Sequence, residues 1–312
     1  MLAKLSRILA PIIFLSMALI ALYVGALALS VDTVSIVFLL GFPFIAGAVI
    51  VHFRPKGTFR SFGASVLFLA ATMLGSFTGS FVFKLEGLIC IAMAIAPLLG
   101  ASMIGGLTYL IYLRWKTETK GAKTVFALPL VAIFCASLLP SEPKTYVISH
   151  DVLIDAPAEK VFEMVKSIPD IQPSEVPTHL SHWLGVPKPT SAVWTQSPAG
   201  SVRHSFWGED VHFLERITEV VENRRISWVF EFPKGWAAQG IEDPHIEVGG
   251  RYFDVLSGSY QINSVGDKTR LTLTTQTYDG SKLGWYAKFW HNFFFEDFHQ
   301  AILSVIKTRA EA

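Results

Sequence analysis

Five long apolar runs, separated by short polar connections, occupy the first 140 residues of the chain. They cover residues 8–29, 33–53, 62–83, 87–113 and 124–139. A helix needs roughly 20 apolar residues to cross the hydrocarbon core of a bilayer. The pattern therefore predicts a membrane domain of about five transmembrane helices over residues 1–140. The fifth run is the shortest and contains Pro129, so a helix lying in the interface or inside the bundle is an alternative for it.

The pattern changes after residue 140, where short alternating segments with turn residues between them replace the apolar runs. Residues 146–154 alternate and are rich in β-branched side chains, which predicts a strand. Asp155 and Pro157 then begin a helix that extends to about residue 168, and a short second helix is predicted at 179–184. Six more strands are predicted at residues 191–196, 202–207, 211–221, 225–232, 260–264 and 269–278, followed by a helix at 284–309. Such close spacing predicts an antiparallel meander in one soluble domain, residues 141–312.

Composition divides the chain at the same place. Charged residues make up 16% of it and the mean hydropathy is +0.44, whereas soluble domains carry about 25% charged residues. Up to Pro140 there are ten Lys and Arg against three acids, and after it 16 against 22. The basic residues do not gather into an arm or stripe, so we expect no nucleic-acid partner.

The connections between the apolar runs alternate in charge. One side of the predicted bundle collects nine Lys and Arg, whereas the other has only Lys84 and Lys144. The nine are Lys4, Arg7, Arg54, Lys56, Arg60, Arg114, Lys116, Lys120 and Lys123. Because basic loops stay on the cytoplasmic side, the N-terminus is expected in the cytoplasm and the soluble domain on the non-cytoplasmic face of an inner or plasma membrane. A cleaved signal peptide is an alternative for the first run, and it would leave the later crossings unchanged.

The apolar runs show packing signals but no transport signals. Gly75 and Gly79 are four residues apart, the spacing at which two membrane helices approach closely. No ionisable side chain can be placed deep within a run, so the bundle is expected to anchor the protein. Cys90 and Cys135 both lie in apolar runs, where we expect small buried side chains without a disulfide or a metal.

The second part of the chain resembles a known superfamily. The resemblance is carried by the strand-to-helix opening at 152–162, by residues 215–219 and 224–230, and by the order of elements up to the terminal helix. Over about residues 145–309 the chain is similar to the SRPBCC superfamily, the helix-grip fold of START domains, Bet v 1 allergens and polyketide cyclase/dehydrase-like proteins. This resemblance implies an α+β domain in which a curved antiparallel sheet wraps around a long C-terminal helix and encloses an apolar cavity. Members bind lipids, sterols or polyketides and a few catalyse reactions, but the superfamily has no universal catalytic motif to transfer.

Candidate ligand-binding residues lie on the predicted inner faces. Alternation along 225–232 places Trp228, Phe230 and Phe232 on the side of the terminal helix, where they form either plain core or the wall of a cavity. Trp290 and Phe294 recur at helical spacing on that helix.

Polar candidates are fewer. The densest polar and aromatic stretch, 203–212, offers Arg203 and Glu209 to orient the polar head of a ligand, and the alternative for this stretch is a solvated hairpin turn. Asp297 falls on the apolar stripe of the terminal helix, where it is either a carboxylate that faces a cavity or a partner in a hydrogen bond to the sheet. The segment 243–247 is a weak metal signal, and we expect no metal site, no cofactor and no assignable catalytic residue.

Three functions remain open. The first is a membrane-anchored module that binds a lipid or other hydrophobic small molecule, with the bilayer and that molecule as partners. The second is an enzyme of cyclase or hydrolase type that uses the same cavity. The third is a non-catalytic interaction or stress-sensing membrane protein whose interior is filled by its own side chains.

Overall fold

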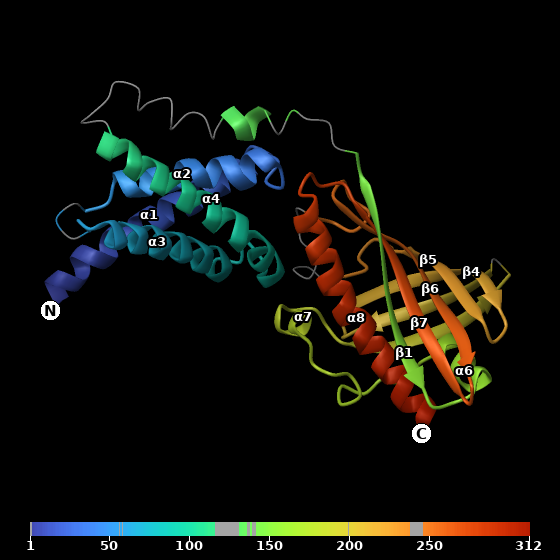
Figure 1. Ribbon diagram of the computed structural model, residues 1–312. Coiled ribbons are helices and arrows are strands. Elements are labelled where there is room, and N and C mark those ends of the chain that lie inside the picture. The colour runs from blue at the N-terminus through green and yellow to red at the C-terminus, as the bar shows by residue number, and fades with distance from the viewer. Residues whose placement is uncertain are drawn as a thin grey trace. The chain divides into compact units, whose positions relative to one another are not determined.

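The chain forms two compact units, Met1–Ser141 and Glu142–Ala312. The computed structural model describes residues 2–55, 57, 59–115, 131–135, 138, 142–198, 200–237 and 246–312 (Figure 1). We refer to the two units as the first and the second unit. Each is described by itself below.

Helices make up the first unit. They are α1 (Leu2–Ala28), the π-helix η1 (Val37–Gly41), α2 (Phe42–His52), α3 (Phe62–Val82) and α4 (Leu88–Trp115). Among the described residues, three apolar helical segments are long enough to cross a membrane, namely Ser6–Ala28, Phe62–Val82 and Leu88–Trp115. They match the first, third and fourth predicted runs.

The second and fifth predicted runs stand differently. The second run is helical over Val37–His52, which is shorter than a typical span. Most of the fifth run, 124–139, lies outside the described residues. The part of it that is described, residues 131–135 and 138, is helical. The bundle of five crossings therefore stays a prediction.

Small residues allow the helices of the first unit to touch. A Cβ atom added at Gly47 of α2 would overlap the carbonyl oxygen of Ser102 in α4, so these two backbones are in contact. A Cβ atom at Gly75 of α3 would lie 2.6 Å from the Ser16 Oγ of α1. A Cβ atom at Gly79 would overlap the side chain of Ile20, one turn further along α1. The Gly75 and Gly79 spacing thus marks the contact between α1 and α3, as expected for small residues four apart.

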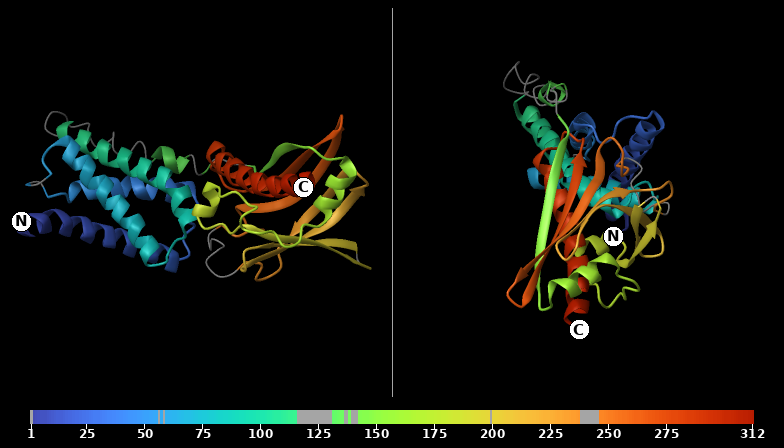
Figure 2. Two further views of the ribbon diagram at one scale, coloured as in Figure 1. Left: turned by 90° about the horizontal axis from the view of Figure 1, so that it is seen from below. Right: turned by 90° about the vertical axis from the view of Figure 1, so that its right-hand side faces the viewer.

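The second unit has the predicted order of elements. Its helices are α6 (Ala158–Lys166), α7 (Leu180–Trp183) and α8 (Trp285–Glu311), and its strands are β1 (Lys144–Ile154), β2 (Pro189–Ser197), β3 (Gly200–Trp207), β4 (Val211–Val221), β5 (Arg225–Glu231), β6 (Phe253–Val265) and β7 (Lys268–Asp279). The strands form one antiparallel sheet in the order β1-β7-β6-β5-β4-β3-β2. Two views at right angles show α8 running along one face of this curved sheet (Figure 2). The predicted helix-grip architecture is therefore confirmed.

One strand is longer than the sequence predicted. β6 begins at Phe253, seven residues before the predicted start at Tyr260. A register shift between Val255 and Ser257 interrupts the alternation there, and Gly258 weakens the strand propensity. Alternation along the sequence therefore does not predict the first part of β6, although these residues pair with β7 in the sheet.

The core of the second unit lies between the sheet, α6 and α8. Ile226 of β5 and Leu271 of β7 are fully buried, as are Val305 and Ile306 of α8. The helix α6 closes the same core with Val161 and its neighbours one turn away. Burial of each such side chain contributes about 1.5–3 kcal/mol, so α8 is integral to the fold.

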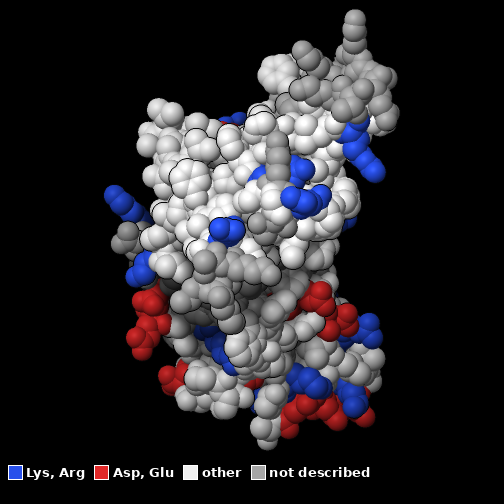
Figure 3. Space-filling view, turned by 90° about the vertical axis from the view of Figure 1, so that its left-hand side faces the viewer, with Lys and Arg blue, Asp and Glu red and all other residues white. Residues whose placement is uncertain are grey.

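Charge is distributed unevenly over the surface. A space-filling view shows a broad uncharged surface with scattered Lys and Arg side chains, and Asp and Glu gathered in another part of it (Figure 3). Exposed apolar side chains such as Phe14, Leu67 and Ile104 belong to the candidate membrane helices. Such a surface is typical of a protein that contacts lipid.

Candidate ligand-binding site

The inner face of β5 forms an aromatic wall. Because every second residue of a strand points to the same side, Trp228, Phe230 and Phe232 follow one another along it. The ring centroids of Trp228 and Phe230 are 6.1 Å apart, and Phe230 and Phe232 are stacked at 6.1 Å. Phe213 of β4 joins them at 5.9 Å from Phe230 and 5.6 Å from Phe232. Trp228 is buried, whereas the three phenylalanines stay half-buried.

A second row of aromatic side chains runs along α8. Trp290 stacks on Phe294 at 5.7 Å, and Phe294 lies 6.2 Å from Phe298. Phe298 packs with Phe230 and Phe232 against the same small core cluster. The structure thus brings the five aromatic candidates together through Phe298. Whether they line a ligand cavity stays a prediction.

Arg203 lies in the interior of the second unit and not at its surface. It is 2% exposed, it forms a buried ion pair with Glu215 of β4, and its Nη1 donates a hydrogen bond to the Val165 carbonyl oxygen at 2.6 Å. The guanidinium carbon lies 4.6 Å from the ring centroid of Trp228 and 5.3 Å from that of Tyr260, which is within cation–π range. Burial alone would lower the pKa of Arg203, but the charge of Glu215 opposes it and the net direction is upward.

Tyr260 completes this interior cluster. It is 3% exposed, and burial raises the pKa of its hydroxyl to about 12. Its ring lies 5.1 Å from that of Trp228. The Trp228 Nε1–H is buried, and among the described residues it has no hydrogen-bond acceptor. A buried donor without a partner costs about 1–3 kcal/mol, so this indole leaves one polar interaction open.

Glu209 does not belong to this cluster. It lies in the turn between β3 and β4 and is exposed, whereas Arg203 is in the middle of β3. The two polar candidates therefore do not act on one group. This part of the 203–212 stretch has the solvated turn that the sequence allowed as its alternative.

Two histidines of α8 face the sheet. His299 is 2% exposed; its Nε2 lies 2.8 Å from Thr275 Oγ1 and its Nδ1 lies 3.0 Å from His150 Nδ1. Burial, with a smaller contribution from His150, lowers the pKa of His299 to about 3. His291 makes a similar contact, with its Nδ1 2.8 Å from Thr277 Oγ1, and burial lowers its pKa as well.

Asp297 of α8 holds the short helix α7. One of its carboxylate oxygens accepts a hydrogen bond from the Ser181 backbone N–H at 2.8 Å, and the other lies 3.9 Å from His179 Nδ1. The sequence left a cavity carboxylate or a hydrogen bond to the sheet open for this residue. In the structure it accepts a hydrogen bond from α7 instead of from the sheet, and so fixes α7 against α8.

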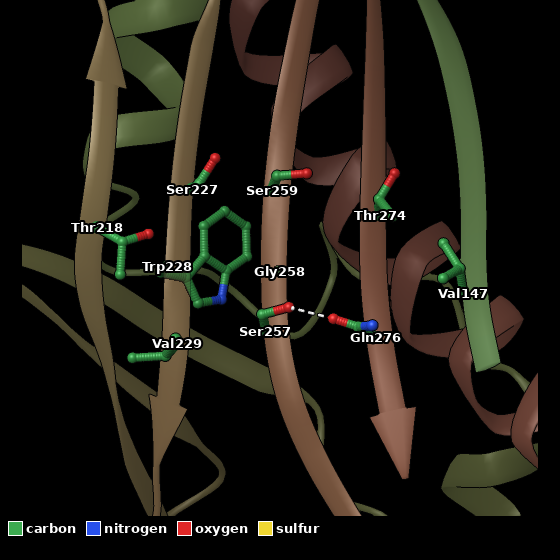
Figure 4. A pocket seen from close by; sticks show the side chains of 10 residues that line it. All are labelled: Val147, Thr218, Ser227, Trp228, Val229, Ser257, Gly258, Ser259, Thr274 and Gln276. Carbon is green, nitrogen blue, oxygen red and sulfur yellow. Dashed lines mark hydrogen bonds between the residues drawn. The ribbon is translucent and has the colours of Figure 1, made fainter. Parts of the chain in front are cut away.

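The pocket seen in Figure 4 is on the other face of the sheet. Small side chains from five strands line an open depression of about 320 Å³, and Ser257 Oγ donates to Gln276 Oε1 at 3.1 Å across it. Its lining includes Ser227 and Val229, which alternate along β5 with the inward Trp228. Its outward side chains therefore face away from α8, but Trp228 of the aromatic wall is also part of its lining, next to Gly258.

Sequence reasoning missed Glu215 and Tyr260 as partners of Arg203. A signal for Glu215 was present, because Trp207 pairs with Val211 across the hairpin and this register places Arg203 directly opposite Glu215. Tyr260 lies at the start of the predicted strand 260–264, where too few residues precede it for alternation to show which side it faces.

Metal ligands are not gathered in the described part of the chain. Within it, no group of three His, Cys, Asp or Glu side chains could hold an ion. Asp243 and His245, the weak metal signal, lie outside the described residues.

Comparisons with known proteins give likenesses of structure. No protein-family model matches the chain, and no curated protein matches it in sequence. Among solved structures, the Zhui aromatase/cyclase from Streptomyces sp. R1128 is 16% identical, with 54% of this chain and 94% of that chain covered at a TM-score of 0.33. Norcoclaurine synthase from Thalictrum flavum is 12% identical, with 55% and 94% covered at a TM-score of 0.33, and Ara h 8.0201 is 11% identical, with 54% and 98% covered at 0.34.

Proposed function

We propose that the second unit binds a lipid or another hydrophobic small molecule between its sheet and α8, and that the first unit anchors it in a bilayer. The observation that carries this proposal is the half-buried state of Phe213, Phe230 and Phe232. These rings lie on the side of the sheet that faces α8, where a closed core would bury them. Covering apolar surface contributes about 25 cal/mol per Å², so an apolar ligand would gain affinity there.

The interior polar cluster supports binding in preference to proton transfer. Arg203 and Glu215 neutralise each other, and the Tyr260 hydroxyl keeps its proton up to about pH 12. A general acid or base works best with a pKa near the working pH, whereas the pKa values of Arg203 and Tyr260 are raised far above it. The open Trp228 Nε1–H, in contrast, suits a ligand that carries one acceptor atom.

Anchoring rests on the three long apolar helices of the first unit. We extend the proposal to orientation, because nine Lys and Arg on one side of the predicted bundle against two on the other favour a cytoplasmic N-terminus. With five crossings, the second unit is then on the non-cytoplasmic face.

A photoactivatable fatty acid tests the ligand site. The full chain in detergent would be irradiated with a diazirine derivative of palmitic acid, and the cross-linked peptides would be mapped by mass spectrometry. We expect cross-links in β5 and α8, and we expect Phe232→Asp to remove them by placing a charge on the aromatic wall.

Phe206→Asp is the matched control. Phe206 is an exposed phenylalanine on the outer side of β3, so this variant should label like the wild type. If the wild type cross-links in the membrane helices but not in β5 or α8, the binding function is wrong. The interior would then be filled by its own side chains, as in the interaction module.

A further inference from the structure

The second unit carries an exposed apolar surface formed by α8 and α7. Trp285 and Phe289 of α8 are 80% and 53% exposed, and Leu180 and Trp183 of α7 are 57% and 74% exposed. Phe293, half-buried, continues the row on α8. We call these five residues the α7–α8 patch. Several large apolar side chains exposed together mark a contact surface.

The patch is continuous along α8. Trp285, Phe289 and Phe293 recur every fourth residue, which places them on neighbouring turns of one side of the helix. Phe289 and Phe293 are stacked at 6.3 Å, and Phe293 lies 5.5 Å from Trp290. The next residue in this series, Asp297, binds the backbone of α7, so α7 extends the patch beyond the third turn.

The chain enters the second unit beside the start of α8. Glu142 and Pro143 alone separate the first unit from β1. Tyr146 of β1 donates a hydrogen bond to Asp279 Oδ2 at 3.0 Å, and its hydroxyl lies 3.3 Å from the Gly284 carbonyl oxygen that precedes α8. The patch therefore begins close to the point at which the chain enters the second unit.

The composition of the patch fits the boundary of a bilayer. Tryptophan concentrates at the level of the lipid headgroups, because its ring is apolar and its N–H is polar. Lys288 lies beside the patch on α8 and is exposed, so its charged end can meet lipid phosphates while its stem lies along apolar surface. A short apolar surface with a basic side chain beside it is typical of a segment that lies in the interface and does not span it.

We propose that the α7–α8 patch is immersed in the headgroup region of the bilayer that holds the first unit, as a second membrane contact in addition to the anchor. This inference requires that the first unit is in a bilayer, but it does not require that the interior binds a ligand. Its partner is the lipid surface and not a protein.

Quenching of a fluorophore by labelled lipid tests the inference in the full chain. Cys90 and Cys135 would be replaced by alanine, and Phe289→Cys would carry the fluorophore NBD in nanodiscs holding one copy of the chain. The nanodiscs would contain phosphatidylcholine and phosphatidylglycerol, part of it with a nitroxide near the headgroup end of one acyl chain. We expect several-fold weaker emission than in nanodiscs without nitroxide.

Two further labels make each outcome decisive. Val220→Cys, at an exposed position of β4, should not be quenched, and Leu67→Cys, at an exposed position of α3, should be quenched. If position 289 is unquenched while position 67 is quenched, the inference is wrong, whether the probe faces water or is covered by protein. Equal quenching at 220 and 289 also overturns it, since the contact would not belong to the patch. If position 67 is unquenched, α3 does not contact lipid, and both the membrane anchor and the inference that depends on it are wrong.

Discussion

Replacement of His299 tests how strongly the stability of the second unit depends on a neutral imidazole. His299 lies between Thr275 of β7 and His150 of β1, with both ring nitrogens in contact with the sheet. Its pKa falls from the usual 6.5 to about 3, mainly because burial disfavours the charged ring. The unfolded chain therefore takes up a proton at this position long before the folded chain does.

The sign of the effect follows from this difference. The folded state binds fewer protons than the unfolded state between about pH 6.5 and about pH 3, so stability must fall as the pH falls through that window. A shift of one pKa unit corresponds to about 1.4 kcal/mol. At about pH 5 the pH is about 1.5 units below the pKa of the unfolded side chain, which is then almost fully protonated, whereas the folded side chain is still neutral. His299 alone should then remove about 2 kcal/mol from the free energy of unfolding between about pH 7 and about pH 5.

Tryptophan emission during urea unfolding measures this loss in the full chain. Seven of the eight tryptophans follow residue 141, so the signal reports mainly on the second unit in detergent solution. His299→Gln keeps a side chain that can bind Thr275 but has no proton to gain. The wild type should lose about 2 kcal/mol more than this variant over the same pH range.

Other groups contribute equally to both proteins. The pKa values of His182, His212 and His291 are also lowered, chiefly by burial, and they destabilise both chains in acid. The difference between wild type and variant therefore reports on His299 together with its contact to His150. Equal losses in the two proteins would refute the reasoning, because the ring would then be protonated without cost in the folded state.

Three more predictions concern the buried ion pair, the packing of Trp228 and the orientation of the chain in the membrane. Arg203→Met leaves Glu215 as an unpaired buried charge and should cost about 3–5 kcal/mol in urea unfolding, and adding Glu215→Leu should recover part of this loss. If the double variant is less stable than the single, the pair is not the cause. Gly258→Ala places a Cβ atom 2.7 Å from the Trp228 Nε1 and should cost about 1–3 kcal/mol with a shift in tryptophan emission; an unchanged spectrum would contradict this packing. Alkaline phosphatase fused after Pro143 should be active if that point is outside the cytoplasm, and an inactive fusion would mean that the number of crossings is even.

Most element positions of the second unit could be predicted, because their signals are local. Alternation and the turn residues placed β4 at Val211–Val221, as the structure has it. The longer β6 could not be predicted, since the register shift between Val255 and Ser257 breaks the alternation and Gly258 interrupts the strand-forming residues.

The candidate site was predictable to a smaller extent. Alternation is sufficient to place Trp228 and Phe230 on one side of a strand, and both point toward the interior. It cannot say how deep a side chain lies, which depends on the helix packed above it. Arg203 was therefore expected near a ligand head but is paired with Glu215 in the interior, because the two strands and α6 close over both groups.

The pairing of β1 with β7 determines when the second unit can fold during synthesis. β1 is the first strand to be made, yet it pairs along its whole length with the last one, and its Tyr146 binds a residue 133 positions further on. At about 5–20 residues per second, roughly 6–25 s pass before its partner has been made. During that interval β1 is an unpaired edge with an apolar face, a feature that promotes aggregation. A chain that stops before residue 268 keeps this edge permanently, so quality control should remove such fragments faster than chains truncated within α8.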